Sequence, residues 1–366
     1  MSNFIISCGG TGGHFSPGIA IGQALMRNGH NVVFIISQKK IDSILSQKYP
    51  DYKFYKAPGV PFSKSPIALA KFAYTQIKSL VFSIKILEKE NCDVAISFGG
   101  FNSLGLALAA KIRSIPVVLH EANRVVGKAT RKLSHIANRV YVPSGVELRR
   151  RRNNLVKFAG YPVREEIQSI QKSEAKEFFG FKNHEKVLLV FGGSQGSLPI
   201  NNWVAENALN LLNKKISILC IGGENSNNMQ NMKILDENSQ EHNLINISFC
   251  DNMAAALSVC EVAIARSGAG SIAEIARCKV PSILIPYPYA ADNHQLENAH
   301  CVERFGAAII VEQKNIDTLT KEVEDLFFND SLKESIAKNL SIVDNLNDIS
   351  KIVDDLSNIA QENFYG

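Results

Sequence analysis

The chain has 366 residues, of which 45% are hydrophobic and 20% are charged, and this composition excludes collagen, coiled coils and disordered tails. The length favours two domains. A net charge of +5 is too small for a protein that coats nucleic acid, so we expect no nucleic-acid partner, but it favours an anionic ligand or a membrane surface. The seven scattered cysteines predict neither a disulfide framework nor a zinc site, which favours a reducing cytoplasm.

The start of the chain predicts neither a signal peptide nor a membrane anchor. Its first apolar run covers residues 4–8 and ends at Gly9. No segment offers the roughly 18 consecutive apolar residues that a transmembrane helix requires. We therefore expect a cytosolic protein, or one on the cytoplasmic face of a membrane.

Short apolar runs alternate with helix-length amphipathic segments, which is the pattern of a parallel sheet covered by crossover helices. In the first half, strands are predicted at 4–8, 31–36, 94–97, 116–120 and 139–142, with a helix over 18–28 that ends at Gly29. In the second half, strands are predicted at 187–191, 216–221, 245–249, 261–265 and 282–285. The sequence thus predicts an α/β protein with two doubly wound, parallel-sheet domains.

A glycine turn follows a predicted strand in both halves, GGTGGH at 9–14 and GGSQGS at 192–197, which indicates two similar domains. We place them at 1–160 and 161–345, with the linker near 159–165. Residues 148–157 contain four consecutive arginines and are predicted to form the frayed surface that ends the first domain. Residues 346–366 are predicted as a helix. That it packs back on the first domain is a hypothesis without direct support in the sequence.

The first glycine turn predicts an anion site, because bare backbone amides at a helix N-terminus can approach a negative group closely. A merely tight turn is the alternative. A dinucleotide fingerprint is not satisfied, since Phe15 occupies its third glycine position and the second strand ends without a carboxylate. His14 ends the turn, where its near-neutral pKa suits a general base, or where it could simply bond to the turn.

Two further turns strengthen the prediction of an anion site. Ser194, in the second glycine turn, could donate to a phosphate oxygen. The third turn, RSGAGS at 266–271, is followed by Glu274, which could accept from ribose hydroxyls or could complete a capping box with Ser271. Three such turns in one chain predict a site for a nucleotide diphosphate.

The segment 287–295 follows the last clear strand of the second half, at the edge where ligands bind in open α/β sheets. Asn293 and Gln295 could bond to sugar hydroxyls or cap the next helix. Asp292 and His294 lack the spacing of a metal site, so we expect no metal and no cofactor.

Lysines recur every seven residues between positions 61 and 87, at Lys64, Lys71, Lys78 and Lys85. A helix would gather them along one edge, and apolar residues lie on more than one of its faces. This pattern suits a helix that contacts lipid headgroups and acyl chains, while one core face with a solvated lysine edge is the alternative. Pro61 and Pro66 are expected to delay the continuous helix until about residue 67.

Six blocks of sequence together resemble the MurG family of bacterial glycosyltransferases, and no one of them would suffice. They are GGTGGHFSPG from residue 9, HEAN from 120, GYPVR from 160, FGGSQGS from 191, RSGAGSIAE from 266 and PYPYAADNHQ from 286. The resemblance implies a GT-B architecture, in which two Rossmann-like domains face each other across a cleft.

The resemblance also implies an inverting, metal-independent transfer of N-acetylglucosamine from UDP-N-acetylglucosamine to the C4 hydroxyl of undecaprenyl-diphospho-N-acetylmuramyl-pentapeptide. This reaction converts lipid I to lipid II in peptidoglycan synthesis, and so serves cell-wall biogenesis, cell shape and cell division. The implied location is peripheral, on the cytoplasmic side of the cell inner membrane.

The resemblance assigns roles by position, with His14 as the general base. The implied donor-binding residues are Thr11, Gly12, Gly13, Asn123, Arg164, Ser194, Cys250, Ala269, Glu274 and Gln295. Among them, Ser194 would hold a phosphate, the backbone of Cys250 the uracil, and Glu274 the ribose. Asn123 and Gln295 would contact the donor sugar, and Arg164 the nucleotide side. The implied membrane patch comprises Lys64, Lys71, Phe72, Lys78, Phe82 and Lys85.

Four positions depart from the family pattern. Tyr161 stands where asparagine is common, Phe101 and Gly105 replace tyrosine and proline, and His294 replaces glutamine. Two other kinds of enzyme would share the fold and the diphosphate turns, a UDP-N-acetylglucosamine 2-epimerase and another glycolipid glycosyltransferase. A nucleotide-sugar-binding module without turnover is a further alternative, and His14 counts against it.

Overall fold

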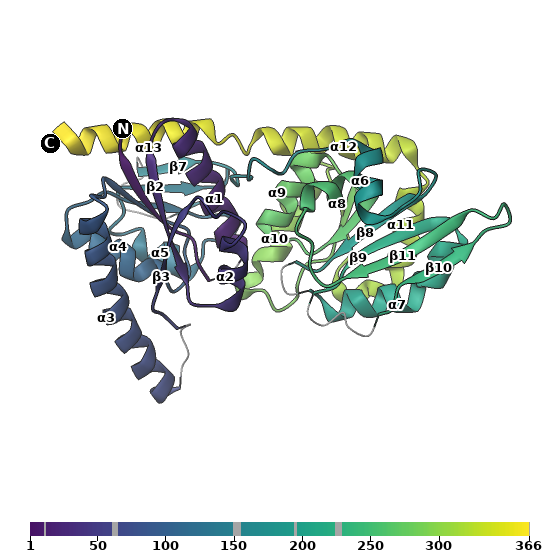
Figure 1. The fold of residues 1–366 in the computed structure, drawn as a ribbon, viewed down its shortest axis with the longest axis horizontal. Helices are drawn as coiled ribbons and strands as arrows, with labels where there is room; N and C mark the ends of the chain where they lie inside the picture. The colour runs from purple at the N-terminus through teal and green to yellow at the C-terminus, as the bar shows by residue number, and fades with distance from the viewer. Residues whose placement is uncertain (11, 61–64, 149–154, 194–195, 224–228, 366) are drawn as a thin grey trace. The chain divides into compact units, whose positions relative to one another are not determined.

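The computed structural model describes residues 1–10, 12–60, 65–148, 155–193, 196–223 and 229–365 (Figure 1). The chain forms two compact units. Unit 1 comprises Met1–Glu165 together with Leu346–Gly366, and unit 2 comprises Glu166–Asn345. Each unit is an α/β domain built on its own sheet.

Unit 1 contains a seven-stranded sheet within its described residues, and all neighbouring strands are parallel. The strands are β1 Asn3–Ser7, β2 Asn31–Ser37, β3 Lys53–Ala57, β4 Val94–Ser97, β5 Val117–His120, β6 Arg139–Val142 and β7 Val156–Phe158. The helices are α1 Gly12–Arg27, α2 Lys40–Ser46, α3 Pro66–Lys89, α4 Ser103–Ile112, α5 Lys128–Leu133 and α13 Ser350–Tyr365. Every residue of β4 and β5 is buried, as expected for strands covered by helices on both faces.

The strand order in unit 1 is β3-β2-β1-β4-β5-β6-β7. Chain direction across the sheet reverses between β1 and β4, so the turns that follow these two strands flank the switch point where open α/β sheets bind ligands. Those turns hold the GGTGGH motif and residues 98–102.

The last helix, α13, packs on unit 1 beside α1 (Figure 1). Ile352, Val353 and Leu356 are buried in the same core cluster as strand residues of β1 and β2. Asp355 accepts hydrogen bonds from the Tyr141 hydroxyl at 2.7 Å and from Lys157 Nζ at 2.6 Å. Burial alone would raise the pKa of Asp355. The pKa nevertheless lies below its usual value, because these two donors and nearby Arg139 favour the carboxylate. The helix is therefore held by both apolar and ionic contacts.

Unit 2 also contains a seven-stranded sheet within its described part, in the order β10-β11-β9-β8-β12-β13-β14. The strands are β8 Lys186–Phe191, β9 Ile216–Ile221, β10 Met232–Leu235, β11 Glu241–Ile247, β12 Cys260–Ala265, β13 Ser282–Leu284 and β14 Ile309–Ile310. The α-helices are α6 Lys172–Phe179, α7 Leu198–Asn213, α8 Met253–Val259, α9 Ala269–Cys278, α10 His294–Arg304, α11 Leu319–Phe327 and α12 Asp330–Asn345, with 3₁₀ helices η3 Ala291–Asn293 and η4 Gln313–Thr318. The pair β10 and β11 is antiparallel, and the other neighbours are parallel.

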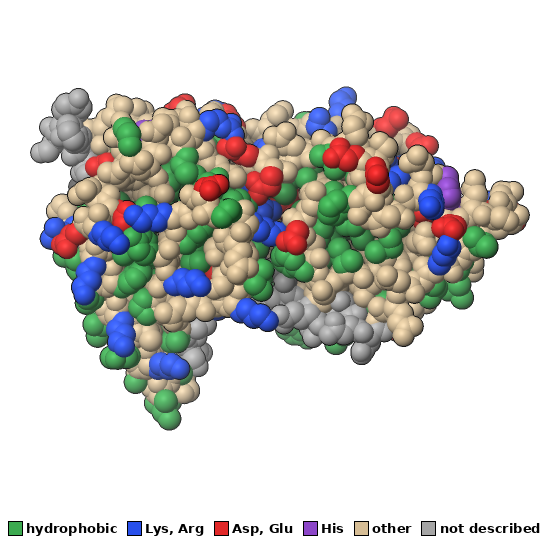
Figure 2. All heavy atoms as spheres, viewed as in Figure 1, with side chains coloured by type: hydrophobic (Ala, Val, Ile, Leu, Met, Phe, Trp, Pro, Cys, Tyr) green, Lys and Arg blue, Asp and Glu red, His purple; other side chains and the backbone are tan. Residues whose placement is uncertain are grey.

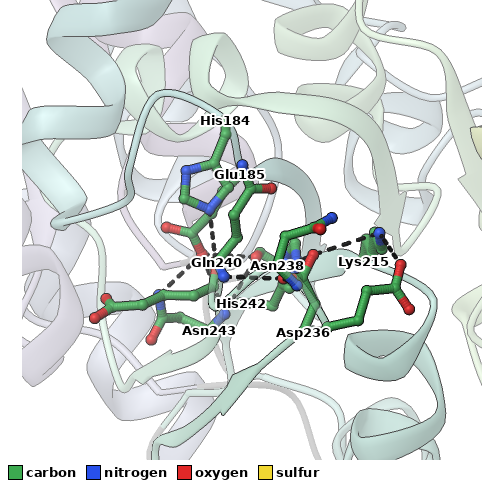
Figure 3. Close-up of polar contacts among 11 residues, drawn as sticks. His184, Glu185, Lys215, Asp236, Asn238, Gln240, His242 and Asn243 are labelled. Carbon is green, nitrogen blue, oxygen red and sulfur yellow. Dashed lines mark hydrogen bonds and ion pairs between the residues drawn. The ribbon is translucent and has the colours of Figure 1, made fainter.

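A cluster of polar side chains, shown in Figure 3, lies where β8, β9 and β11 begin, and thus at the amino-terminal edge of the unit 2 sheet. Glu185 is fully buried and accepts hydrogen bonds from Ser217 Oγ at 2.7 Å and from Asn243 Nδ2 at 2.9 Å. Hydrogen bonds from the backbone N–H groups of Gln240 and Asn238 lower the pKa of Asp236 to about 2. These contacts join β9 to the β10–β11 hairpin, which gives the cluster a structural explanation.

All ten strands expected from the sequence are present, with ends that differ by up to four residues. Four others were not predicted, namely β3, β7, β10 and β14, and each of them lies at an edge of its sheet. The expectation of a frayed end at 148–157 was wrong for Val156 and Lys157, which lie in β7 and pair with Val140 and Tyr141 of β6, while residues 149–154 lie outside the described residues. The predicted helix over 18–28 begins earlier, at Gly12. No described helix is both long enough and apolar enough to cross a bilayer.

Candidate active site

The glycine turn after β1 is held tightly against the end of β2. A Cβ at Gly9 would lie 2.2 Å from the backbone nitrogen of Ser37, and Gly10 has a φ of +110° that favours glycine. Thr11 lies outside the described residues. Because α1 begins at Gly12, Gly12, Gly13 and His14 form its first turn, and the expectation that they belong to a loop was wrong. Their N–H groups remain at the positive end of the helix.

The half-buried His14 side chain lies against the second turn of the switch point. A Cβ at Gly100 would come within 3.3 Å of the imidazole, and one at Gly99 within 3.8 Å. Burial lowers the pKa of His14 below the usual histidine value, and the negative charges of Glu121 and Asp42 oppose this shift in part. The imidazole is therefore neutral near pH 7 and able to accept a proton.

The HEAN block follows β5 and forms an ordered turn near His14. Glu121 is almost fully buried and accepts from the backbone N–H of Asn123 at 3.0 Å, from Asn123 Nδ2 at 3.2 Å and from the N–H of Gly127 at 2.8 Å. His120 is buried and lies 3.0 Å from the carbonyl oxygen of Gly160, and burial lowers its pKa to about 4. Glu121 thus orients the side chain of Asn123, for which the family resemblance implies a contact with the donor sugar.

Tyr161 contacts the first turn of α1 at a point where the helix lacks a hydrogen bond. Pro17 has no N–H to donate to the carbonyl oxygen of Gly13, four residues earlier. The Tyr161 hydroxyl lies 3.5 Å from that oxygen. Arg164, for which the family resemblance implies a place on the nucleotide side, belongs to unit 1 and donates to the Tyr49 hydroxyl at 3.3 Å.

In unit 2, chain direction reverses between β8 and β12, so the second and third glycine turns flank the switch point. The turn after β8 includes Ser194, which lies outside the described residues, and it leads into α7. Gly196 has a φ of +73°, and a Cβ there would lie 2.1 Å from the carbonyl oxygen of Gly222. This turn is therefore closely packed against the end of β9.

Arg266 connects the turns of unit 2, and the sequence did not single it out. It is buried directly after β12, and its Nη2 donates to Ser197 Oγ at 2.7 Å and to Gln313 Oε1 at 2.6 Å. Its Nη1 donates to the carbonyl oxygens of Ile285 and Pro286. Burial lowers the pKa of Arg266 to about 10, so it stays charged near pH 7. Its position at the head of RSGAGS, after an apolar strand, was the available signal.

The third turn places Ala269 as the first residue of α9 and Glu274 half-buried further along the same helix. The N-cap of α9 is Gly268, so the alternative in which Glu274 completes a capping box with Ser271 was wrong. Cys250 is buried just after β11, before Asn252 caps α8 by accepting from the N–H of Ala255. These residues all lie at the carboxyl edge of the sheet.

Gln295 lies in the first turn of α10, where its Oε1 accepts from the backbone N–H of Tyr287 at 3.0 Å. Its backbone carbonyl accepts from Ser267 Oγ at 2.8 Å. Asn293 occupies the N-cap position without a side-chain cap bond. The described residues contain no group of three His, Cys, Asp or Glu side chains suited to a metal ion.

The predicted membrane patch lies along α3, which begins at Pro66 with Ser65 as its N-cap, near the expected start. Lys64 lies outside the described residues, whereas Lys71, Lys78 and Lys85 are exposed. Ile67, Tyr74 and Ile77 are 84%, 58% and 63% exposed, and Figure 2 shows lysine and apolar side chains interspersed along this helix.

The phenylalanines of the predicted patch differ from its lysines. Phe72 is half-buried, and Phe82 packs against the unit 1 core with its ring centroid 6.5 Å from that of Tyr55. Phe82 therefore differs from the exposed members of the predicted patch, because a helix turns residue 82 to the face that contacts the sheet.

Comparison with known proteins gives consistent matches over the whole chain. The Glycosyltransferase family 28 N-terminal domain matches residues 4–142, and the Glycosyltransferase family 28 C-terminal domain matches residues 187–355. A relative from Opitutus terrae, named UDP-N-acetylglucosamine--N-acetylmuramyl-(pentapeptide) pyrophosphoryl-undecaprenol N-acetylglucosamine transferase, is 40% identical over 99% of this chain and 96% of its own length. A relative of the same name from Protochlamydia amoebophila is 35% identical over 88% of this chain and 86% of its own.

Solved structures agree on the fold. The crystal structure of Acinetobacter baumannii MurG covers 96% of this chain and 98% of its own, with a TM-score of 0.67 and 19% identity. The structure of the glycosyltransferase of kitacinnamycin covers 98% of this chain and 99% of its own, with a TM-score of 0.72 and 15% identity. Both support the GT-B fold. With two family 28 domains in order and near full-length relatives at up to 40% identity, the chain belongs to glycosyltransferase family 28, among the MurG transferases.

Proposed function

We propose that this protein transfers N-acetylglucosamine from UDP-N-acetylglucosamine to the C4 hydroxyl of undecaprenyl-diphospho-N-acetylmuramyl-pentapeptide, the lipid I to lipid II step of peptidoglycan synthesis. The relatives named for this transfer match nearly the full length of the chain, so the activity is carried over with both domains present. The observation that carries the chemistry is the His14 imidazole, kept neutral by burial at the switch point of unit 1.

The proposed reaction is a single inverting displacement. The acceptor oxygen forms a bond to C1 of the sugar as the bond between C1 and the diphosphate oxygen breaks, and His14 takes the proton of the attacking hydroxyl. A neutral imidazole suits this role, because it has a free nitrogen lone pair to accept the proton. Asn123, fixed by Glu121, is proposed to contact the donor sugar.

The departing UDP needs stabilisation of its developing negative charge. The N-termini of α7 and α9 offer backbone N–H groups and the positive ends of helix dipoles. Arg266 belongs to the turn that precedes α9, donates to Ser197 Oγ at the end of the turn that precedes α7, and adds a positive charge there. Ser194, Ala269 and the backbone of Cys250 are proposed to hold the diphosphate and uracil, with Glu274 on the ribose and Gln295 on the transferred sugar.

We further propose that the protein acts at the cytoplasmic face of the membrane that holds the lipid acceptor. The exposed apolar side chains of α3, among them Ile67, Tyr74 and Ile77, and its exposed lysines suit insertion among lipid headgroups. Lys78 Nζ lies 4.6 Å from the centre of the Tyr74 ring. This part of the proposal involves Lys71, Phe72, Lys78 and Lys85, together with Lys64.

The test is release of UDP from UDP-N-acetylglucosamine with a soluble lipid I analogue, with EDTA and without it, and again without acceptor. We expect acceptor-dependent release that survives EDTA. Conversion of the UDP-sugar without acceptor would indicate an epimerase instead. Tight binding of UDP-N-acetylglucosamine without any turnover, for this acceptor and for other lipid acceptors, would refute the transferase.

A further inference from the structure

A buried carboxylate near the proposed base has no role in the mechanism above. Asp42 lies in the first turn of α2 and is completely buried. Its Oδ2 accepts from the backbone N–H of Gly10 at 2.7 Å, from the backbone N–H of Ser37 at 2.9 Å and from Ser37 Oγ at 2.5 Å. One carboxylate oxygen thereby ties the glycine turn after β1 to the end of β2.

The other side of the same turn is held by Lys39. Its Nζ donates to the carbonyl oxygen of Gly10 at 2.9 Å and lies 5.4 Å from the ring centre of Phe101, which belongs to the turn after β4. Gly10 therefore has its N–H and its carbonyl fixed by two charged side chains of opposite sign. Four residues further along the chain stands His14.

Both of these charges also act on His14. The charge of Asp42 stabilises the imidazolium that forms when His14 accepts a proton, that of Lys39 opposes it, and Glu121 is the other acidic group that faces the ring. A carboxylate that only closed the turn between β2 and α2 would have no need to bind Gly10.

We propose that Asp42 is a positioning residue for the transfer reaction: it fixes the glycine turn through Gly10 and thereby sets the place of His14. This role rests on the proposed function. Asp42 lies in α2, outside the sequence motifs that contain the glycine turn and His14, so the proposal adds a buried carboxylate to the site.

The variant Asp42→Asn tests the proposal with little change of shape. Asp42 Oδ1 has no hydrogen-bond partner among the described residues, so an amide nitrogen there would break no existing bond while the amide oxygen still accepts from Gly10 and Ser37. We expect kcat to fall about ten- to a hundredfold, because a neutral amide replaces charge-assisted hydrogen bonds with weaker ones and so holds the glycine turn less precisely. KM for UDP-N-acetylglucosamine, whose proposed phosphate, uracil and ribose contacts lie in unit 2, should stay within about twofold.

The pH profile separates this role from a purely structural one. Removing the negative charge lowers the pKa of His14 further, so the acid limb of kcat/KM should move to lower pH. The same direction should appear in an NMR titration of the His14 ring, which requires no acceptor. The matched control is Glu90→Gln, which removes a carboxylate bound to Lys53 and Tyr55 at the opposite edge of the same sheet and should leave the acid limb in place.

Ser37→Ala keeps the charge of Asp42 but removes one of its donors, so it should lower kcat less and leave the acid limb unchanged. If Asp42→Asn does not fold, Ser37→Ala becomes the test of the positioning role. An unaltered kcat in Ser37→Ala would then overturn the proposal. If wild-type protein releases UDP with acceptor but Asp42→Asn keeps both its kcat and its acid limb, only the role of Asp42 is refuted. Wild-type protein without acceptor-dependent release would refute the proposed function itself.

Discussion

At the scale of single residues, the proposed chemistry depends on one imidazole and on the groups that surround it. Replacing His14 by alanine removes the base but none of the proposed phosphate, uracil and ribose contacts, which lie in the turns of unit 2. We expect turnover to fall by about a hundredfold or more, the usual scale for a lost general base, while UDP affinity changes by no more than a few fold. Steady-state rates and calorimetry with UDP measure the two quantities. Near-normal turnover would remove His14 from its role.

The residues that sequence reasoning missed at this scale are those whose partners are distant in the chain. Asp42 binds Gly10 from 32 positions away, and Arg266 binds Ser197 from 69 positions away. Motif spacing reports neighbours along the chain, so it identified His14 and the glycine turns but gave no reason to select Asp42 from a short polar helix. Which long-range contacts a lone carboxylate makes is decided by how strands pair, and that information is not local.

At the scale of elements, the contact between α3 and α4 explains one departure from the family pattern. A Cβ at Gly105 would lie 2.2 Å from Ser79 Oγ and 2.8 Å from Ser79 Cβ, so the two helices meet where only glycine fits. We expect Gly105→Ala to destabilise the protein by about 1 to 3 kcal/mol through overpacking. The double variant with Ser79→Gly should recover part of this loss, as measured by urea unfolding. Additive losses in the double variant would contradict the explanation.

The exposed lysines of α3 lead to a separate prediction about binding to lipid surfaces. Each lysine near an anionic membrane contributes about 1 kcal/mol, so replacing Lys71, Lys78 and Lys85 by alanine should weaken binding to vesicles rich in anionic lipid by about a hundredfold. The matched control replaces three exposed lysines of unit 2, namely Lys279, Lys321 and Lys338. Vesicle co-sedimentation at low and high salt provides the measurement. Equal losses in both triple variants would indicate a general charge effect and argue against the patch.

Edge strands mark the limit of what the sequence predicts about elements. Most inner strands are apolar runs, because helices cover both of their faces. The inner strand β11 is an exception, since it reads EHNLINI and alternates buried with half-buried residues over its first half. The edge strand β3 reads KFYKA, with an exposed lysine at positions 53 and 56. The edge strand β10 reads MKIL, and its alternate residues are exposed. Neither strand forms a continuous apolar run. A strand that is half exposed and four or five residues long resembles a loop until its partner is known.

At the scale of the whole molecule, each unit has its own sheet and its own buried core. Calorimetry should therefore resolve two unfolding transitions, of which UDP-N-acetylglucosamine stabilises the one that belongs to unit 2. At a ligand concentration of about 100 times Kd, the stabilisation is about 2.7 kcal/mol, or about 5 to 10 °C. A fluorescent label in each unit identifies the transitions. A shift confined to the unit 1 transition would contradict the proposed division of roles.

The place of α13 has a consequence for the growing chain on the ribosome. Unit 1 is finished by the last segment of the chain, which is translated only after the whole of unit 2. At 5 to 20 residues per second, that delay is roughly 10 to 40 seconds. During this time the apolar surface that Ile352, Val353 and Leu356 will cover stays open to solvent and to chaperones. A nascent chain that stalls before residue 350 thus contains all of unit 2 but an unfinished unit 1, so the units are completed in the reverse of the order in which their synthesis begins.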